Sequence, residues 1–447
     1  MSEINLKKNI SFTTVAQAIT MLTAFVVNWF LARFLGPDLR GRYVYLFTVN
    51  SVVWMLFDLG VSKSFMYSLQ REKADPRALY SLTLVTFGVS ILVSLLIFGF
   101  FSDSILGGAE YHPVVIIALA LYIAMFLMHN RQKVISIGMN EIKDYSLQLM
   151  LPSILFMVLI LPLFWTFKQS FRMESSFLLY ALTMFIVISI FHVRIVKQTS
   201  FKFIWDKVLI KSSYIMGFRA FLSEYMLIMM TRVDMLILKH LSSFADLGVY
   251  ALAINFVDII NVTSNMIGIV ILNKFAALND DNASLEILRK VFVLMIMFNV
   301  VCIVGMAVLG PFVINFMYTN EYIGAYKAFM YMVPAIFGLT LGSLFNTFLW
   351  SKGFPVFTIV APFIATAIKS LISYLIIPIY GYNGAAISSS IVYPLWFLIL
   401  LVWYFTTHKE SKIGSLITRK EDFIDLYQIV QSVFNKIRGN NESNIYQ

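Results

Sequence analysis

The run from Val291 to Met317 reads VFVLMIMFNVVCIVGMAVLGPFVINFM, with no charged residue. A helix rises about 1.5 Å per residue, so about 20 apolar residues cross the hydrocarbon core of a bilayer. Barrel strands would instead alternate polar and apolar residues over about ten positions. The run is apolar on every face, which is typical of a helix surrounded by lipid or by other helices. It predicts a transmembrane helix.

Eleven further runs of this kind lie along the chain, bounded by charges or by glycine and proline clusters. In the first half they extend over Ile10–Ala32, Tyr43–Tyr67, Leu79–Phe101, Pro113–Ile135, Leu147–Phe167 and Ser176–Val196. In the second half they extend over Ser213–Leu238, Gly248–Leu272, Ala325–Trp350, Val356–Ile379 and Gly384–Phe405, in addition to Val291–Met317. The sequence therefore predicts an all-α polytopic membrane protein with twelve transmembrane helices in two six-helix halves around a central cleft.

The composition agrees with this count. Of 447 residues, 59% are hydrophobic and 13% are charged, whereas an ordinary soluble domain is about half apolar and about a quarter charged. This balance excludes most soluble enzymes and a single-span receptor. The only cysteine, Cys302, excludes disulfide scaffolds, cysteine zinc sites and iron–sulfur clusters. The first run is too long for a signal peptide, so we expect it to be retained.

The net charge of +10 mostly reflects the orientation of the chain in the membrane. Lys and Arg gather in cytoplasmic loops, and 23 of the 34 bases fall on the side of the N-terminus and of every second loop, against seven on the opposite side. We therefore expect an inner-membrane protein with both termini in the cytoplasm, and no nucleic-acid partner. Bases close to a span end, such as Arg131, are counted with the adjoining loop, and the four that remain inside the predicted spans are Lys63, Arg219, Arg232 and Lys369.

Matching landmarks in the two halves predict an internal duplication, as in many transporters. The pairs are Gly41 with Gly248, Tyr43 with Tyr250, Gly138 with Gly353, and Pro162 with Pro378. The expected divisions are residues 1–197 and 213–407 for the halves, 198–212 for a linker, and 408–447 for a cytoplasmic tail. Two six-helix halves inserted with the same topology would enclose a cleft that opens to either face in turn, which favours a transporter.

The two hydrophilic segments have patterns of their own. The stretch FKFIWDKVLIK, residues 201–211, mixes aromatic and basic residues and predicts an amphipathic helix on the cytoplasmic leaflet. The tail is too short for an independent core. Its residues 421–437 have apolar side chains at helical spacing, so we expect a helix that lies against the membrane or the protein.

Four motifs, in order along the chain, carry a resemblance to a known family. They are LGPDLRGRY from Leu35, FDLG from Phe57, RVDMLIL from Arg232 with GVY from Gly248, and PIYGYNGAAISSS from Pro378. Together they resemble the polysaccharide transport family, which includes the Wzx-type flippases of O-antigen and capsule repeat units and belongs to the multidrug/oligosaccharidyl-lipid/polysaccharide (MOP) exporter superfamily. The resemblance implies export of undecaprenyl-diphosphate-linked oligosaccharide from the cytoplasmic to the periplasmic leaflet. One departure is ILNKFAAL from Ile271, where such sequences often carry a proline.

Ionisable side chains at bilayer depth are costly and therefore mark candidate cavity residues. Lys369 lies deepest when counted from the start of its span, and Glu224 lies at comparable depth, so a Lys369–Glu224 pair is one hypothesis. Arg219 either lines the cavity or extends to the cytoplasmic face. Basic groups here would offset the charge of a diphosphate. On this reading Lys369→Ala impairs export and leaves membrane abundance intact.

The remaining candidates each have a functional and a structural reading. Asp58 and Asp258 either serve as carboxylates of a gate or coupling-ion site or make structural bonds. For Asp58 the structural partner would be Lys63 or a neighbouring hydroxyl. Lys63 either extends to the cytoplasmic interface or contacts an entering diphosphate. Arg232 and Asp234 lie near the outer end of their span, where interfacial solvation is the favoured reading. Arg33 is read first as an interfacial anchor.

Enzyme signatures are absent from the sequence: it has no phosphate loop, nucleophile elbow or zinc-protease motif. We expect a transporter without cofactor or metal, driven by an ion gradient or the membrane potential. It would act as a monomer beside a possible glycan polymerase or other export machinery. The alternatives are a MATE-type exporter of drugs or organic cations, with Asp58, Asp258 or Glu224 as binding groups, and a glycan polymerase or acyltransferase, which would need larger outer loops.

Overall fold

The computed structural model describes the backbone of residues 3–70, 72–106, 111–166, 172–277, 281–353, 355–409, 413–416, 419 and 422. Over these residues the fold is all helical, with no strand. The helices are α1 (Glu3–Asp58), α2 (Val61–Gln70), α3 (Pro76–Leu106), α4 (Pro113–Gly138), α5 (Ile142–Thr166), α6 (Arg172–Thr199), α7 (Lys207–Leu241), α8 (Phe244–Ala277), α9 (Asp281–Met317), α10 (Ile323–Tyr331), α11 (Val333–Ser351), α12 (Phe357–Tyr380) and α13 (Tyr382–Thr407), with short 3₁₀ turns η3 (Asn320–Tyr322) and η4 (Ile413–Ser415).

Ten of the described helices are long and apolar enough to cross a membrane, so the chain is a multi-pass membrane protein. Each of the twelve predicted spans falls on one or two of the thirteen described α-helices, although not all on these ten. α1 contains the first span and most of the second, and is one of the ten, whereas α7 carries charges along its length and is not among them. The all-α polytopic fold is therefore confirmed, and twelve crossings stay a prediction.

Backbone breaks divide two of the predicted spans, and a third break, at Gly36, falls in the loop predicted between the first two spans. Gly36 has φ 71 and ψ 171, and Pro37 follows it, so α1 turns back here as two arms. Glycine reaches positive φ without a side-chain clash, and proline cannot continue the preceding helix. The predicted span 43–67 is interrupted at Leu59 and Gly60, which both have positive φ. The predicted span 325–350 is interrupted at Met332, between α10 and α11.

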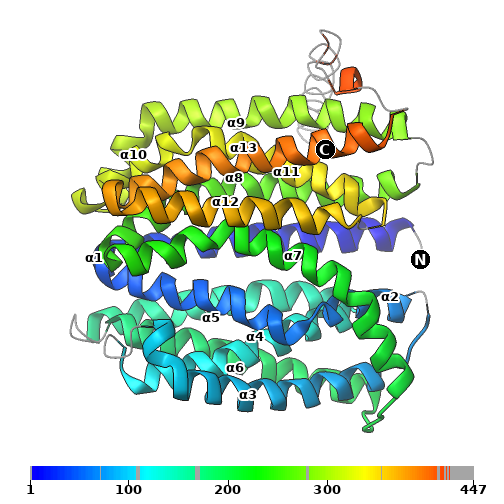
Figure 1. Cartoon of the computed structure of the whole chain (residues 1–447). Helices are drawn as coiled ribbons and strands as arrows, with labels where there is room; N and C mark the ends of the chain where they lie inside the picture. Colours follow the sequence, from blue (N-terminus) through cyan, green and yellow to red (C-terminus); the bar gives the residue numbers. More distant parts are fainter. Residues whose placement is uncertain are drawn as a thin grey trace, which may run out of the picture.

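The helices form two groups with a seam between them (Figure 1). α1 and α2 pack with α3 to α6, and α7 and α8 pack with α9 to α13. Across the seam α1 contacts α7 and α8, and α2 contacts α7. We call the end of the bundle where α1 begins the inner end, which the base count predicts to be cytoplasmic, and the opposite end the outer end. The predicted limits of the halves, linker and tail stay predictions.

The linker differs from its prediction. Residues 201–206 form no helix, and α7 begins at Lys207. Asp206 stops a helix from starting earlier because its carboxylate accepts hydrogen bonds from the N–H groups of Val208 and Leu209, which is the arrangement of an N-cap. The amphipathic helix expected from residue 201 is therefore wrong for its first six residues. The helix expected over 421–437 lies outside the described residues, apart from Asp422.

Glycines bring the two groups into backbone contact at both ends of the seam. At the outer end a Cβ on Gly41 would lie 1.8 Å from the Phe244 carbonyl oxygen, and one on Gly248 would lie 1.9 Å from that of Pro37. At the inner end a Cβ on Gly60 would lie 2.1 Å from the Gly217 oxygen, and one on Gly217 would lie 2.3 Å from the Gly60 oxygen. We call these the outer and inner seam contacts. The inner contact is reciprocal between its two glycines, and the outer one includes the two glycines, Gly41 and Gly248, that the repeat had paired.

Candidate substrate cavity

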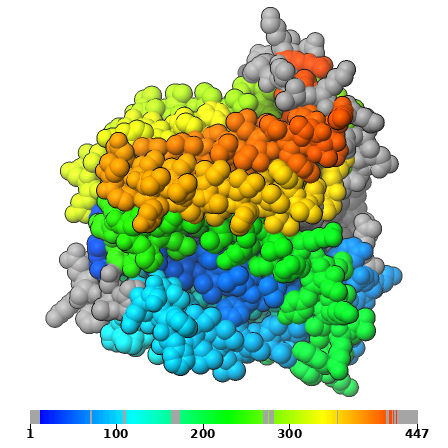
Figure 2. Space-filling model, viewed as in Figure 1, coloured from blue at the N-terminus to red at the C-terminus, as the bar shows by residue number. Residues whose placement is uncertain are grey.

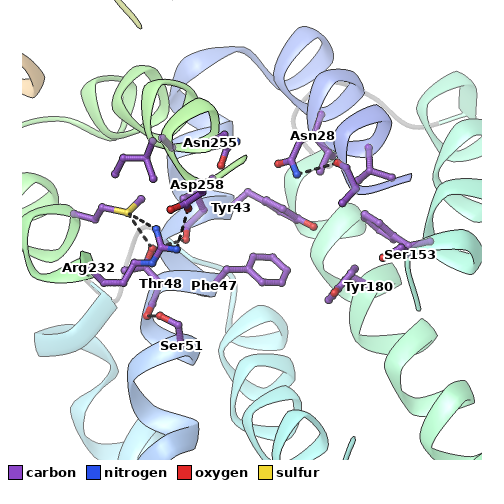
Figure 3. A pocket seen from close by; sticks show the side chains of 18 residues that line it. Asn28, Tyr43, Phe47, Thr48, Ser51, Ser153, Tyr180, Arg232, Asn255 and Asp258 are labelled. Atoms are coloured by element: carbon purple, nitrogen blue, oxygen red, sulfur yellow. Dashed lines mark hydrogen bonds and ion pairs between the residues drawn. The ribbon is translucent and has the colours of Figure 1, made fainter. Parts of the chain in front are cut away.

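A cavity of about 310 Å³ lies at the seam between the two groups (Figure 3). Both arms of α1 line it, together with α5, α6, α7 and α8. The lining residues are Ala24, Val27, Asn28, Leu31, Tyr43, Val44, Phe47, Thr48, Ser51, Ser153, Phe156, Tyr180, Arg232, Met235, Ala251, Ile254, Asn255 and Asp258. Concave sites with mostly apolar walls and a few convergent polar groups are the usual places where small molecules bind.

One ion pair faces this cavity. The Arg232 Nη2 lies 3.0 Å from the Asp258 Oδ2 and joins α7 to α8. The side chains are 29% and 38% exposed, so solvent or a ligand can reach both. Arg232 Nη1 lies 4.0 Å from the Met235 sulfur, which is a weak acceptor. Because a guanidinium carries five N–H donors, Arg232 can hold Asp258 and still present donors to an anion in the cavity.

Aromatic and hydroxyl groups supply the rest of the polar character. The Phe47 ring on α1 meets the Tyr180 ring on α6 edge-on, with ring centroids 5.2 Å apart, and Tyr43 stands one turn from Phe47 on α1 (Figure 3). Thr48 and Ser51 continue the same arm. Flat apolar ring faces beside hydroxyl groups suit a ligand with both C–H faces and hydroxyls, such as a sugar.

Lys369 lies outside this cavity. Its Nζ is 2.8 Å from the Asp234 Oδ2, and both side chains are 0% exposed. It also donates to the Tyr393 hydroxyl at 2.9 Å and the Met230 carbonyl at 3.0 Å. Asp234 in turn accepts hydrogen bonds from Tyr250 and Ser389. The Lys369–Glu224 pair expected from depth is therefore wrong, and so is the interfacial placement of Asp234.

Asp58 belongs to a second buried network, in the N-terminal group. Its Oδ1 lies 3.0 Å from the Arg131 Nε, and it accepts a hydrogen bond of 2.6 Å from the Ser62 hydroxyl. Arg131 also donates to Thr86. The expected bond to a neighbouring hydroxyl is thus confirmed, and the expected bond to Lys63 is wrong. The network lies directly beside the break at Leu59 and Gly60, so it fixes the joint between α1 and α2.

The other candidates lie at the two ends of the seam. Lys63 on α2 and Glu224 on α7 form an ion pair of 3.4 Å across the inner seam contact. At the outer end, Arg33 donates to the Phe316 carbonyl at 2.9 Å and so joins α1 to α9. Arg219 is exposed near the inner end. Of the eight candidates, then, only Arg232 and Asp258 share the cavity.

Two charged residues that the sequence analysis counted as loop bases are in fact buried. Arg131 is 0% exposed because α4 continues to Gly138, seven residues past it. Arg40 is 1% exposed, lies over the Tyr322 ring at 5.6 Å, and has no hydrogen-bond partner for Nη1 or Nη2 among the described atoms. The predicted span already extended past Arg131 to Ile135, so the burial of Arg131 could have been inferred from the sequence.

Metal ligation has no support in the described ranges, where no three His, Cys, Asp or Glu side chains gather around one point. The seam cavity presents an ion pair, aromatic rings, hydroxyls and the amides of Asn28 and Asn255. A polytopic helical protein with two helix groups around such a cavity has the architecture of a membrane transporter.

Comparison with known proteins agrees with this class. The fold is similar to that of the lipid II flippase MurJ in an inward-closed conformation, with a TM-score of 0.74 and 15% identity over 95% of this chain and 98% of that one. It is also similar to an inward-facing multidrug resistance MATE family transporter of the MOP superfamily (TM-score 0.68, 15% identity, 90% and 99% covered). A third match is a MOP superfamily transporter from Pyrococcus furiosus (TM-score 0.63, 13% identity, 91% and 97% covered).

Residues 6–272 match the model of the polysaccharide biosynthesis protein family. This match covers more than half of the chain, which therefore belongs to that family. No curated protein matches the chain. The resemblance seen in the sequence is confirmed at the level of family and fold.

Proposed function

We propose that this protein is a flippase that moves undecaprenyl-diphosphate-linked oligosaccharide repeat units across the bacterial inner membrane by alternating access. Membership of a polysaccharide biosynthesis family supports the class of cargo. The MurJ-like fold supports the type of movement, because that neighbour is a lipid II flippase. The proposal includes the predicted cytoplasmic termini, monomeric state, and energy from an ion gradient or the membrane potential.

The observation that carries the proposal is the chemistry of the seam cavity. A lipid-linked sugar presents a diphosphate, hydroxyls and C–H faces. Arg232 offers charge-assisted donors for the diphosphate, while Tyr43, Phe47 and Tyr180 offer ring faces and Ser51 a hydroxyl for the sugar. Charges attract each other more strongly at low dielectric, so a guanidinium in this cavity offsets more of the free-energy cost of desolvating an anion than a water-exposed base would. The polyprenyl tail can stay in lipid while the head group crosses.

In the proposed cycle the two seam contacts act as the gates of this cavity. Each gate is a close backbone contact at a glycine. The Lys63–Glu224 ion pair lies beside the inner gate, and the hydrogen bond from Arg33 to the Phe316 carbonyl lies beside the outer gate. Parting the inner contact would expose the cavity to the side that delivers the cargo. Parting the outer contact would expose it to the side that receives it.

A MATE-type exporter of organic cations is the second candidate, favoured by the MATE neighbours and by the cavity carboxylate Asp258. A cation-binding carboxylate has to be free of a fixed positive partner, and Asp258 is held by Arg232 at 3.0 Å. The cavity therefore suits an anionic or neutral cargo better. A glycan polymerase or acyltransferase has no comparable support, because the solved structures to which the fold is similar are a flippase and transporters.

Arg232→Gln should lower export of the repeat unit by about tenfold or more, since it removes a charge-assisted contact worth about 1.5–3 kcal/mol. The measurement is surface polymer and the sidedness of the lipid-linked unit in a strain that lacks the gene and has no second flippase. Arg232→Lys should recover part of the activity. The exposed Lys143→Gln serves as a control and should behave as wild type. Unchanged surface polymer after deletion of the gene would refute the flippase proposal outright.

A further inference from the structure

A second concave surface lies away from the seam cavity, on the side of the bundle where α7 begins. It is an apolar groove of about 430 Å³ lined by Leu56, Phe57, Leu59, Leu82, Val85, Thr86, Val89, Trp205, Ile210 and Tyr214. Two of these lining residues, Thr86 and Tyr214, carry a hydroxyl group. The Thr86 hydroxyl already accepts a hydrogen bond from Arg131. Leu56 and Val89 are 45% and 51% exposed, so the groove opens outward from the helix bundle, not into its core.

The linker forms one rim of this groove and is fixed in place. The Ile204 N–H donates to the Ser81 hydroxyl of α3 at 3.0 Å, and the Phe201 ring meets the Tyr80 ring edge-on at 5.6 Å. Trp205 then stands over the groove, 46% exposed and stacked on Phe203. Exposed aromatic residues of this kind collect at the membrane interface. The rim therefore marks the level where hydrocarbon gives way to head groups.

Bases surround the same rim. Lys202, Lys207 and Lys211 are all exposed. The one acid among them, Asp206, uses its carboxylate to cap α7 at 2.9 and 3.0 Å. Ile210 and Tyr214 are four residues apart, so they share the face of α7 that lines the groove. Lys207 precedes Ile210 by three residues and Lys211 precedes Tyr214 by three, so both lysines lie on or beside that face. Figure 2 shows this first part of α7 (green) lying against the N-terminal helices (blue and cyan).

From this placement we infer a binding site for an anionic phospholipid, with an acyl chain in the groove and its phosphate at the lysine rim. Basic pockets between transmembrane helices at the predicted cytoplasmic side are typical of sites for anionic head groups. The volume is at the lower end of the range for small-molecule pockets, which suits one hydrocarbon chain and is too small for a partner helix. The charge at the rim selects an anionic lipid over a zwitterionic one.

The site also touches the inner seam contact. Leu59 lines the groove and precedes Gly60, and the groove-lining turn of α7 precedes Gly217. A chain bound between α1, α3 and α7 therefore bridges the two helix groups beside that contact. The inference holds for any cargo, since it depends on the groove and its rim alone.

The test is native mass spectrometry of the full-length protein, purified in detergent and offered phosphatidylglycerol, phosphatidylcholine or undecaprenyl phosphate at equal concentration. We expect one tightly retained phosphatidylglycerol. Val85→Phe, which fills the groove with apolar atoms, should lower its occupancy by about tenfold. Lys207→Gln/Lys211→Gln should lower it similarly, as expected for two bases near an anionic surface.

Matched controls keep the result specific. Val308→Phe changes an exposed apolar residue on α9, and Lys143→Gln/Lys327→Gln removes two exposed bases, on α5 and α10; both should retain wild-type occupancy. Equal retention of phosphatidylcholine, preferential retention of undecaprenyl phosphate, or full phosphatidylglycerol binding by both groove and rim variants would overturn the inference. A loss of flippase activity alone would not bear on it.

Discussion

Gly217→Ala should reduce transport by about 5- to 150-fold while the protein remains in the membrane at normal abundance. The added Cβ would lie 2.3 Å from the Gly60 carbonyl oxygen. Overpacking of this kind costs about 1–3 kcal/mol, and a difference of that size changes the population of a state by about 5- to 150-fold. Only the state with a closed inner contact contains the clash. Transport falls because that state has to form in every cycle.

This prediction is checked by measuring how efficiently a cross-link forms across the inner seam contact. In a Lys63→Cys/Glu224→Cys protein, a short thiol cross-linker should join α2 to α7 efficiently, because the native side chains meet at 3.4 Å. Adding Gly217→Ala should lower that yield. Gly88→Ala is the matched control, since a Cβ on Gly88 in α3 meets nothing within 4 Å. Equal cross-linking and full transport in the Gly217→Ala protein would show that the contact is not part of the cycle.

A substitution at the outer seam contact should disfavour the other closed state of the cycle. A Cβ on Gly248 would lie 1.9 Å from the Pro37 carbonyl oxygen, so Gly248→Ala disfavours the state closed at the outer end. In that variant the inner cross-link should form at least as well as in the parent, although transport is again lost. The two alanine variants therefore separate the two ends of the cycle.

Lys369→Met should destabilise the protein strongly, by about 3–5 kcal/mol, because it leaves Asp234 charged and unpaired in the interior. Both side chains are fully buried and the pair links α7 to α12. We expect low membrane abundance and a lower midpoint of thermal unfolding in detergent. Asp234→Asn should have a similar effect, since it leaves Lys369 without its counter-charge.

The double variant distinguishes packing from transport. Lys369→Met/Asp234→Leu removes both charges, and apolar replacement of a buried pair is often neutral or stabilising. Tyr250 retains the Ala385 carbonyl as an acceptor at 3.3 Å. Abundance should therefore recover, and transport with it, because neither residue lines the cavity. Normal abundance with lost export in Lys369→Met would instead support the role that the sequence suggested, direct contact with cargo.

The helical fold was predictable from sequence because a backbone in lipid must satisfy its hydrogen bonds internally. Long apolar runs such as Val291–Met317 leave no other option. The pairing of charges was not predictable in the same way. Depth counted from span starts placed Glu224 level with Lys369, yet the contact is with Asp234, ten residues further along α7. The two helices therefore do not begin at the same level, which hydropathy cannot show.

The cavity residues show the same limit. Arg232 was recognised as a base inside a span, but its distance from the span end suggested solvation at the interface. Its position at the seam depends on how α7 packs against α1 and α8. Arg131 and Arg40 were misread because they lie close to predicted ends of helices that continue past them or fold back. A residue type marks a candidate, and packing decides its partner.

Reconstitution of the purified protein in sealed vesicles tests the central proposal most directly. A labelled undecaprenyl-diphosphate-linked oligosaccharide is placed in one leaflet, and its sugar is probed from the other side with an impermeant reagent. The wild-type protein should make the sugar accessible, Arg232→Gln should do so at least about tenfold more slowly, and Gly217→Ala about 5- to 150-fold more slowly. Vesicles in which the wild-type protein leaves the sugar inaccessible, no better than protein-free vesicles, would contradict the proposed flippase.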